Sequence, residues 1–313
     1  MITLGLVELA GAYSLGDWKL GAELSTGFVN ENYRIDTASS QFFLRIYRRQ
    51  SLESIESEMD LYCALNAIEF PTAYPIAKTD GGFVSKTERG HAVLYEFLAG
   101  ETPDITHDTA FQIGTAIGKL SNLESRWQSK SNQTSWAFCE TTLPKLSNST
   151  ARFRSFESFE HYTGVLKEVA QADLPTGVVH GDVFPDNTLF QQGQLTGIID
   201  FDEFCHETLL FELAMAINGF GFVDNRLVES PLKGICSGYF EQRRLDDEEL
   251  RLLPRYIQLT ALAMSCWHIN NGVIDSSNPR SLARAEELVG RVIELEGQLE
   301  QIGEWVNTPE TLE

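Results

Sequence analysis

The chain has 313 residues, of which 42% are apolar, so it is long enough to bury a large core in one or two domains. Its 24 basic and 45 acidic residues give a net charge of −21, which repels nucleic acids and anionic membranes and disfavours both as partners. The five cysteines are scattered, no basic leader opens the chain, and no apolar run is long enough to span a bilayer, so we expect a cytoplasmic protein.

The first hundred residues show the pattern of a small antiparallel sheet crossed by one helix. Alternating apolar residues predict strands, and apolar residues spaced three or four apart after a polar cap predict helices. The expected elements are a helix at 6–13, strands at 32–37 and 41–47, a helix from the cap Ser51 to about residue 68, and strands at about 82–85 and 91–97.

The same periodicities predict which side chains of these elements face inward. Strand 41–47 divides its side chains between two faces, with Phe42, Leu44 and Ile46 on one and Phe43, Arg45 and Tyr47 on the other. On the helix, four side chains form the stripe that we expect to be buried: Leu52, Ile55, Met59 and Tyr62. Glu58 lies at the flank of that stripe.

Beyond Gly100 the pattern becomes helical. Helices are expected at 106–122, at about 208–219, at 246–270 and at 280–305, and Asp246 with Glu249 has the pattern of a capping box. Residues 126–163 carry no assignable pattern. We therefore expect two domains, 1–97 and 98–313, joined by a hinge at about residues 96–101.

One stretch carries most of the functional information, and it reads His180-Gly181-Asp182-Val183-Phe184-Pro185-Asp186-Asn187. Asn187 follows Asp182 by five positions, which is the spacing of the protein-kinase catalytic loop, H-R-D-x-x-x-x-N. An apolar hairpin that turns at Gln192-Gly193 then leads to Asp200, at the place of the kinase D-F-G aspartate. An aspartate at a strand end is also a common turn former, but the strands on either side favour a functional site.

Phosphoryl transfer explains why these residue types occur together. The reaction needs an acceptor for the proton of the substrate hydroxyl, and hard oxygen ligands for Mg²⁺ beside the phosphates of ATP. We therefore predict Asp182 as the catalytic base, and Asn187 and Asp200 as the Mg²⁺ ligands.

Three longer segments extend this pattern: GFVNENYRIDT, HGDVFPDNTLF and LTGIIDFDEFCHETLLFELAMAINGF. With them the chain resembles the aminoglycoside phosphotransferase/choline kinase superfamily over about residues 20–270, and within it the type II homoserine kinases most. The resemblance implies an α+β, bilobal protein-kinase-like fold with a small antiparallel-sheet N-lobe and a larger, mainly helical C-lobe. It also implies an ATP- and Mg²⁺-dependent phosphotransferase acting on a small-molecule hydroxyl, with an amino alcohol such as homoserine as the expected acceptor.

The resemblance further implies nucleotide-binding roles in the N-lobe. Arg45 occupies the position where many kinases have a phosphate-binding lysine, and Glu58 matches the helix glutamate that pairs with it. The remaining candidates are Gly27 and Asn30 to Asn32 in the loop that covers the nucleotide, and Glu96 and Leu98 in the hinge beside adenine. An inward-facing Arg45 paired with Glu58 is chemically sensible because a buried, unpaired arginine is costly. The alternative is that Arg45 is a surface charge on an edge strand.

Three further residues are candidates for contacts with the substrate or a second metal ion. Asp186 either reaches the substrate or belongs to a turn, and Asp202 either touches a second metal ion or faces solvent. Arg255 lies in the helix where type II homoserine kinases carry arginines suited to a substrate carboxylate. Gln258 and Ala263 stand where other cations are expected, so the substrate either lacks a carboxylate or binds it elsewhere.

Other functions stay open at this point. Within the same reaction class, the acceptor is alternatively choline, ethanolamine, a sugar or an aminoglycoside, or a protein Ser/Thr side chain as in stress-type kinases. Outside the enzymes, the alternative is a nucleotide-binding pseudokinase module, which the arginine at position 45 leaves open. The intact Asp182, Asn187 and Asp200 argue against that module, since a non-catalytic protein has no chemical need for all three.

Overall fold

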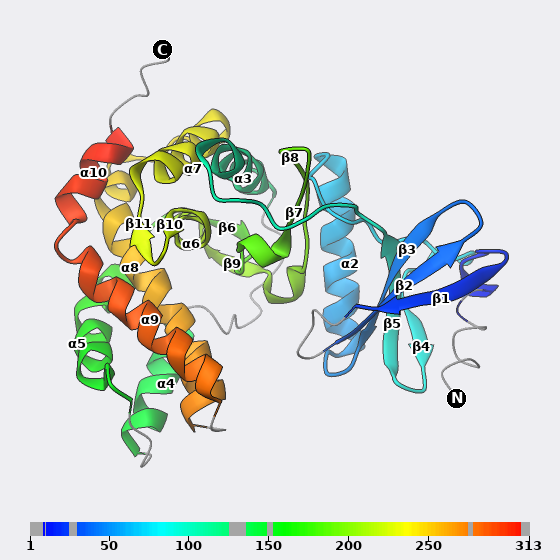
Figure 1. Cartoon of the computed structure of the whole chain (residues 1–313), viewed down its shortest axis with the longest axis horizontal. Coiled ribbons are helices and arrows are strands. Elements are labelled where there is room, and N and C mark those ends of the chain that lie inside the picture. The colour runs from blue at the N-terminus through cyan, green and yellow to red at the C-terminus, as the bar shows by residue number, and fades with distance from the viewer. Residues whose placement is uncertain are drawn as a thin grey trace. The chain divides into compact units, whose positions relative to one another are not determined.

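The structure is a computed structural model, and it describes residues 9, 11–24, 30–124, 136–148, 153–274 and 278–307. The chain divides into two compact units, Met1–Gly100 with Thr196–Ile199, and Glu101–Leu195 with Asp200–Glu313. Figure 1 shows the strands β1 to β5 and the helix α2 of the first unit, and the helices α3 to α10 of the second. In the described part of the chain, no helix is long and apolar enough to cross a membrane.

The first unit is built on a five-stranded antiparallel sheet with the strand order β1-β2-β3-β5-β4. Its elements are β1 (Trp18–Glu23), β2 (Glu31–Thr37), β3 (Gln41–Tyr47), α2 (Leu52–Ala67), β4 (Ser85–Thr87) and β5 (Gly90–Glu96). The predicted strands at 32–37 and 41–47 and the helix after Ser51 are confirmed, whereas β4 begins where the strand predicted at 82–85 ends. Strand β1 is absent from the prediction because its register with β2 shifts after Leu20, which breaks the alternation. Half of the residues of the helix expected at 6–13 lie outside the described residues, and residues 9, 11 and 12 are helical.

The two faces of β3 divide its side chains as predicted. Leu44 and Ile46 belong to a buried apolar cluster, whose other members include Tyr33, Ile35, Ala92 and Leu94. Complete burial of one such aliphatic side chain stabilises the fold by about 1.5–3 kcal/mol. Arg45 alternates with them and lies beside the ring of Tyr47, on the opposite face of the sheet.

Helix α2 begins after Ser51, whose Oγ accepts a hydrogen bond from the backbone N–H of Ser54 at 3.2 Å. Three of the four residues in the predicted stripe are buried: Ile55, Met59 and Tyr62. The prediction for Leu52 is wrong, because the residues around the start of the helix are exposed and Leu52 itself is 42% exposed. Glu58 is fully buried, so it belongs to the buried face and not to its flank.

The second unit is mainly helical. Its helices are α3 (His107–Leu120), α4 (Trp136–Asn148), α5 (Phe156–Leu166), α6 (Leu209–Phe220), α7 (Glu229–Gln242), α8 (Asp247–Ile269), α9 (Pro279–Leu295) and α10 (Leu299–Asn307). The helices predicted at 106–122, 208–219 and 246–270 are confirmed, as is the capping box of Asp246 and Glu249. The pattern at 280–305 corresponds to two helices, because the chain turns at 296–298. Helices α4, α5 and α7 are absent from the prediction, and Pro144 inside α4 weakens the helical pattern there.

Short antiparallel strand pairs carry the predicted motif. β6 (Thr176–Val179) pairs with β9 (Cys205–Thr208), β7 (Thr188–Gln191) pairs with β8 (Gln194–Ile198), and β10 (Phe222–Val223) pairs with β11 (Arg226–Leu227). Residues 180–187 therefore leave β6 and enter β7 through the 3-10 helix η2 (Pro185–Asn187). Residues 199–204 leave β8 and enter β9 through the 3-10 helix η3 (Phe201–Glu203). Both connections are short, so their polar residues are closely tied to the strands.

Candidate active site

The segment from His180 to Asp182 forms a tight turn at the end of β6. Gly181 has φ 81°, a conformation that a residue with a side chain rarely adopts, and the turn follows directly from it. The backbone N–H of Asp182 donates to His180 Nδ1 at 3.2 Å, and the buried His180 ring packs against Phe201 with 4.4 Å between ring centroids. His180 thus joins the two halves of the motif.

Asp182 and Asn187 are in direct contact. Asn187 Nδ2 donates to the backbone oxygen of Asp182 and to Asp182 Oδ2, both at 2.9 Å. Both bonds use the nitrogen of the amide, so neither occupies Asn187 Oδ1, the atom that suits a metal ion. The five-residue spacing therefore closes a compact loop in which the predicted base and a predicted ligand orient each other.

Asp182 lies among other acidic groups. Burial, as the largest cause, and the negative charges of Asp186 and Asp200 raise the pKa of Asp182 from 3.8 to about 7, against a lowering by the Asn187 hydrogen bond. Glu203 raises this pKa further. Asp182 and Asp200 are thus close enough to interact electrostatically, as the sequence predicts. A carboxylate with a pKa near neutrality is suited to accept a proton.

Asp200 has an unusual backbone conformation. Its φ of 70° and ψ of 65° place it in the left-handed region, which costs about 1–3 kcal/mol for a residue with a side chain, although aspartate tolerates it better than most. The chain turns sharply here, between Ile199 and the 3-10 helix η3. This turn fixes the direction in which the Asp200 carboxylate leaves the backbone.

Glu212 is not among the predicted site residues, but its carboxylate holds the backbone of the loop at His180 and Gly181. Its Oε1 accepts the backbone N–H of His180 at 2.9 Å, and its Oε2 accepts that of Gly181 at 3.0 Å. Burial raises the pKa of Glu212 from 4.5 to about 7, although the two backbone donors lower it. One feature of the sequence could have identified Glu212: it is the single charged residue of the apolar helix LLFELAMAINGF. A charge in such a helix is buried and therefore needs a hydrogen-bonding partner.

In the first unit, Glu58 belongs to a buried polar cluster. Its Oε1 accepts hydrogen bonds from the hydroxyl of Tyr47 at 2.9 Å and from that of Tyr95 at 3.4 Å. The two hydroxyl oxygens also lie 2.5 Å from each other. Burial is the main reason why the pKa of Tyr95 is well above its usual value of 10.0. The sequence predicts Tyr47 on the same strand face as Arg45, but it places only Arg45 beside Glu58.

Arg45 is buried on the central strand β3, with 8% of its surface exposed. This placement contradicts the alternative of a surface charge on an edge strand. Its Nε donates to Asn32 Oδ1 at 3.4 Å, and the guanidinium carbon lies 5.8 Å from the ring centroids of both Phe43 and Tyr47. The structure therefore brings together Arg45 and Asn32, two of the predicted nucleotide-binding residues.

The other predicted residues of the first unit have less specific surroundings. Glu96 ends β5, where its backbone N–H donates to the oxygen of Tyr74 at 2.9 Å. Leu98 packs so closely on Gly197 that a β-carbon at position 197 would lie 2.4 Å from a Leu98 methyl carbon. Gly27 lies outside the described residues.

Among the predicted substrate contacts, Arg255 is occupied by another part of the chain. Its Nη1 and Nη2 donate to the two carboxylate oxygens of Glu296 at 2.6 and 3.0 Å, and Nη1 also donates to Gln258 Oε1 at 2.8 Å. Asp186 is exposed on η2, and Asp202 is half-buried on η3. Their roles stay predictions, but Arg255 has less capacity for a substrate carboxylate than the sequence suggests.

The acidic residues around Asp182 suit a divalent cation. Asp186, Asp200 and Glu203 all raise the pKa of Asp182, so a positive ion beside Asp200 would relieve their mutual repulsion. Within the described residues, no three His, Cys, Asp or Glu side chains form a metal site by themselves. Mg²⁺ that arrives with a nucleotide needs fewer protein ligands, since phosphates and water complete its shell. The oxygens of Asn187 and Asp200 fit such a partial ligand set.

Solved structures with this fold include several kinases. An amicoumacin kinase in complex with AMP-PNP and Ca²⁺ aligns with a TM-score of 0.70 at 16% identity, over 92% of each chain. A microcompartment-associated aminopropanol kinase aligns with a TM-score of 0.66 at 18% identity, over 95% of this chain and 98% of that one. The predicted fold, with an antiparallel-sheet N-terminal part and a mainly helical C-terminal part, is confirmed.

Sequence relatives agree with the structural ones. Homoserine kinase from Neisseria meningitidis serogroup B is 28% identical over 249 residues, which cover 77% of this chain and 80% of that protein. Homoserine kinase from Nitrobacter winogradskyi is 26% identical over 274 residues, which cover 82% of this chain and 81% of that protein. A model of the phosphotransferase enzyme family matches residues 21–253, and the chain therefore belongs to the phosphotransferase enzyme family, as its motifs predict.

Proposed function

We propose that the protein is a kinase that uses ATP and Mg²⁺ to phosphorylate the hydroxyl of a small amino alcohol, with homoserine as the first candidate. The observation that carries the proposal is the half-buried Asp182, whose pKa is raised to about 7 and whose carboxylate is held by Asn187 beside Asp200. The relatives named homoserine kinase support the choice of acceptor.

Each residue has a defined task in this proposal. Asp182 accepts the hydroxyl proton, because its pKa makes it an effective base near neutral pH. Asn187 keeps the Asp182 carboxylate oriented, and its Oδ1 with the carboxylate of Asp200 holds Mg²⁺. Bound Mg²⁺ neutralises charge on the ATP phosphates. In the first unit, Arg45 supplies positive charge to the phosphates, held in place by its contacts with Asn32 and the neighbouring aromatic rings.

Coupled ATP turnover with homoserine, threonine, choline, ethanolamine and aminoglycosides tests the proposal. Asp182→Ala is expected to lose turnover by at least about 100-fold while nucleotide binding persists, because only the proton acceptor is removed. Asp173→Ala is the matched control, since Asp173 is exposed just before β6. Unchanged turnover in Asp182→Ala would exclude Asp182 as the base. Phosphorylation of a peptide panel in place of the small alcohols would assign the protein to the Ser/Thr kinases.

The metal assignment has its own test. Asp200→Ala is expected to abolish the Mg²⁺-dependent part of nucleotide binding, which isothermal titration with and without Mg²⁺ measures directly. A variant with the Mg²⁺-dependent affinity of the wild type would contradict the assignment. Nucleotide binding by the wild type without turnover on any acceptor would favour the pseudokinase module.

A second candidate acceptor is an amino alcohol without a carboxylate. The specific observation is the bidentate pairing of Arg255 with Glu296, together with the uncharged Gln258 and Ala263 where cations are expected. The fold likeness to an aminopropanol kinase is compatible with this acceptor. Parallel kcat/KM measurements on homoserine and 1-amino-2-propanol separate the two candidates. A ratio above about tenfold in either direction, equal to about 1.4 kcal/mol, decides between them.

A further inference from the structure

The hairpin of β7 and β8 carries both proposed metal ligands at its open end. Strand β7 begins directly after Asn187, and β8 ends two residues before Asp200. The turn consists of Gln192 and Gly193, with φ 53° and 77°, as in two-residue hairpins of type I′. Gln192 is a non-glycine residue at positive φ, so this turn is not the intrinsic preference of the chain. A contact from outside the hairpin can therefore stabilise this turn.

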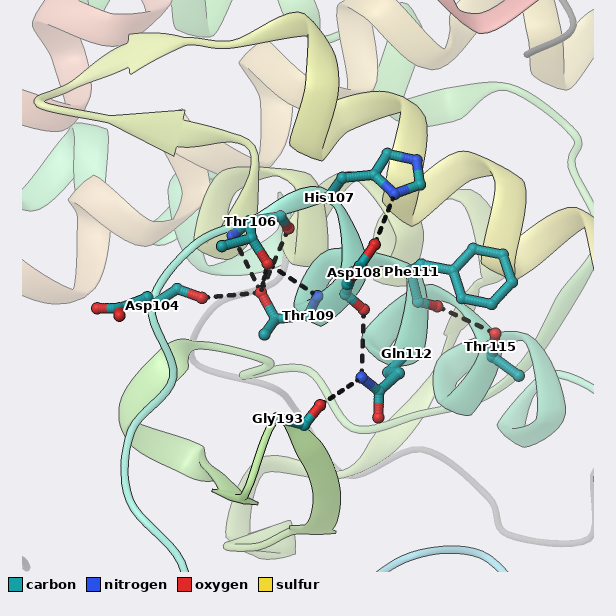
Figure 2. A network of polar contacts seen from close by, with 9 residues as sticks. All are labelled: Asp104, Thr106, His107, Asp108, Thr109, Phe111, Gln112, Thr115 and Gly193. Atoms are coloured by element: carbon teal, nitrogen blue, oxygen red, sulfur yellow. Dashed lines mark hydrogen bonds and ion pairs between the residues drawn. The ribbon is translucent and has the colours of Figure 1, made fainter. Parts of the chain in front are cut away.

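Gln112 on α3 provides such a contact. Its Nε2 donates to the backbone oxygen of Gly193 at 2.8 Å, and its Oε1 accepts the backbone N–H of Leu195, also at 2.8 Å. Figure 2 shows the side-chain amide of Gln112 reaching from the helix to Gly193. Both polar ends of one amide are thus bonded to backbone groups of the hairpin, in the manner of a neighbouring strand. The contact joins residues that are 81 and 83 positions apart in the sequence.

Helix α3 is a rigid base for this contact. Thr106 and Thr109 form a capping box at its start, and Thr109 Oγ1 also donates to the oxygen of Asp104 at 2.8 Å (Figure 2). Along its length, α3 packs on α7 with almost no space between the backbones. A β-carbon at Gly114 or at Gly238 would lie 2.0 Å from a backbone oxygen of the opposite helix. The helix therefore cannot shift without losing this packing.

The two strands of the hairpin are held by different partners. Phe190 on β7 exchanges two backbone hydrogen bonds of 2.9 Å with Glu101. Gln112 holds the turn and the start of β8, which leads to Asp200. Further along β8, Thr196 Oγ1 donates to the backbone oxygen of Ala99 at 3.1 Å, and the backbone N–H of Ile198 donates to the oxygen of Pro71 at 2.9 Å. Loss of Gln112 would therefore free the turn and the start of β8, while the other hydrogen bonds of the two strands remain.

We propose that Gln112 is a positioning residue of the active site, which sets the place of Asp200 relative to Asn187 by holding the hairpin between them. The inference rests on the proposed function, in which these two residues bind Mg²⁺. Its measurable consequence is a weaker dependence on Mg²⁺ when Gln112 is lost, with the catalytic base unaltered. A role in folding alone would lower the thermal stability and leave the Mg²⁺ concentration for half-maximal nucleotide binding unchanged.

The test uses Gln112→Leu, which removes both hydrogen bonds at nearly constant volume, and Gln112→Glu, which keeps the acceptor for Leu195 and loses the donor for Gly193. Gln191→Leu is the matched control, because Gln191 is exposed on the same hairpin. We measure binding of a fluorescent ATP analogue over a Mg²⁺ titration, together with the melting temperature. Gln112→Leu is expected to raise the half-saturating Mg²⁺ concentration about fivefold to tenfold, Gln112→Glu by a smaller factor, and Gln191→Leu by less than twofold.

Three other outcomes overturn the inference, and they are distinguishable. Folded Gln112 variants with the half-saturating Mg²⁺ concentration of the wild type refute the positioning role and leave the proposed function intact. If Gln191→Leu raises the half-saturating Mg²⁺ concentration as much as Gln112→Leu does, the effect comes from any substitution on the hairpin and not from the loss of the Gln112 hydrogen bonds. Nucleotide binding by the wild type that does not respond to Mg²⁺ refutes the proposed metal site, and the role of Gln112 with it.

Discussion

Glu212→Gln removes the negative charge beside the backbone N–H groups of His180 and Gly181 with almost no change of side-chain shape. In the wild type, burial raises the pKa of Glu212 from 4.5 to about 7, although two backbone N–H groups donate to its carboxylate. When the carboxyl is protonated, it resembles the carboxamide of glutamine, because each then offers one acceptor oxygen. The two proteins differ in charge only when Glu212 is ionised.

The raised pKa sets the sign of the pH dependence. Between pH 4.5 and about 7, the unfolded chain has released the proton while the folded chain still holds it, so a rise in pH favours unfolding. The stabilisation by this proton is complete below pH 4.5 and is lost as the pH rises through about 7. At about 1.4 kcal/mol for each pH unit, the total loss is about 3 kcal/mol, of which about 2 kcal/mol falls above pH 5.5. The glutamine variant does not titrate, so we expect it to gain this amount relative to the wild type.

Urea unfolding of both proteins at pH 5.5 and pH 8 measures the effect, since the sequence pI of about 4.6 favours precipitation at lower pH. The free energy of unfolding of Glu212→Gln minus that of the wild type is expected to rise by about 2 kcal/mol between the two pH values. A constant difference would refute the pKa argument, and a fall would show that the two N–H bonds outweigh burial. Turnover at pH 8 is expected to drop at least about tenfold, because the amide nitrogen of glutamine would face one of the two backbone N–H donors and shift the loop that carries Asp182.

Two further changes test the packing around the proposed sites. Tyr47→Phe is expected to lower the free energy of unfolding by about 1–3 kcal/mol, because the buried Glu58 loses the nearer of its two hydroxyl donors, at 2.9 Å, and urea unfolding measures this loss. Gly114→Ala is expected to lower the melting temperature and destabilise the fold by about 1–3 kcal/mol or more, because the added methyl group would lie 2.0 Å from the backbone oxygen of Ile235.

Each of these changes has a control on the same chain. Tyr33→Phe is expected to change the stability by less than about 1 kcal/mol, because its partner Glu31 keeps its ion pairs with Arg48 and Arg89. Gly290→Ala on α9 has open space around the added methyl group and is expected to stabilise the helix by about 0.5–1 kcal/mol. Destabilisation by Gly290→Ala similar to that by Gly114→Ala would remove close packing as the explanation.

The predictable part of the site depends on short stretches of chain. Asp182 and Asn187 lie in one loop between two short strands, and their spacing alone allows the contact that the structure contains. The helices with clear caps, such as the one after Thr106 and the one after Asp246, were equally predictable because a cap and its partner are three residues apart. In such cases the interacting atoms are close along the chain, so the sequence pattern contains the interaction.

The unpredicted part depends on contacts between distant segments. The Glu212 carboxylate accepts hydrogen bonds from backbone N–H groups 31 and 32 residues away. Every residue type except proline has such a group, so the sequence does not indicate which of them Glu212 contacts. Arg255 pairs with Glu296, 41 residues away, at a point where one predicted helix proves to be two. Tyr47 and Tyr95 meet Glu58 only because neighbouring strands and the helix over them place three buried side chains together.

The sequence by itself determined the family, the sheet-then-helix architecture and the spacing of Asp182, Asn187 and Asp200, because each depends on local periodicity or on a short motif. Only the tertiary structure decided how these residues are supported. It raised the pKa of Asp182 by burial, placed Glu212 under the loop and brought Gln112 to the hairpin. The physical reason is that burial and hydrogen bonding between distant segments depend on how helices and strands pack, and packing has no signature within any one segment.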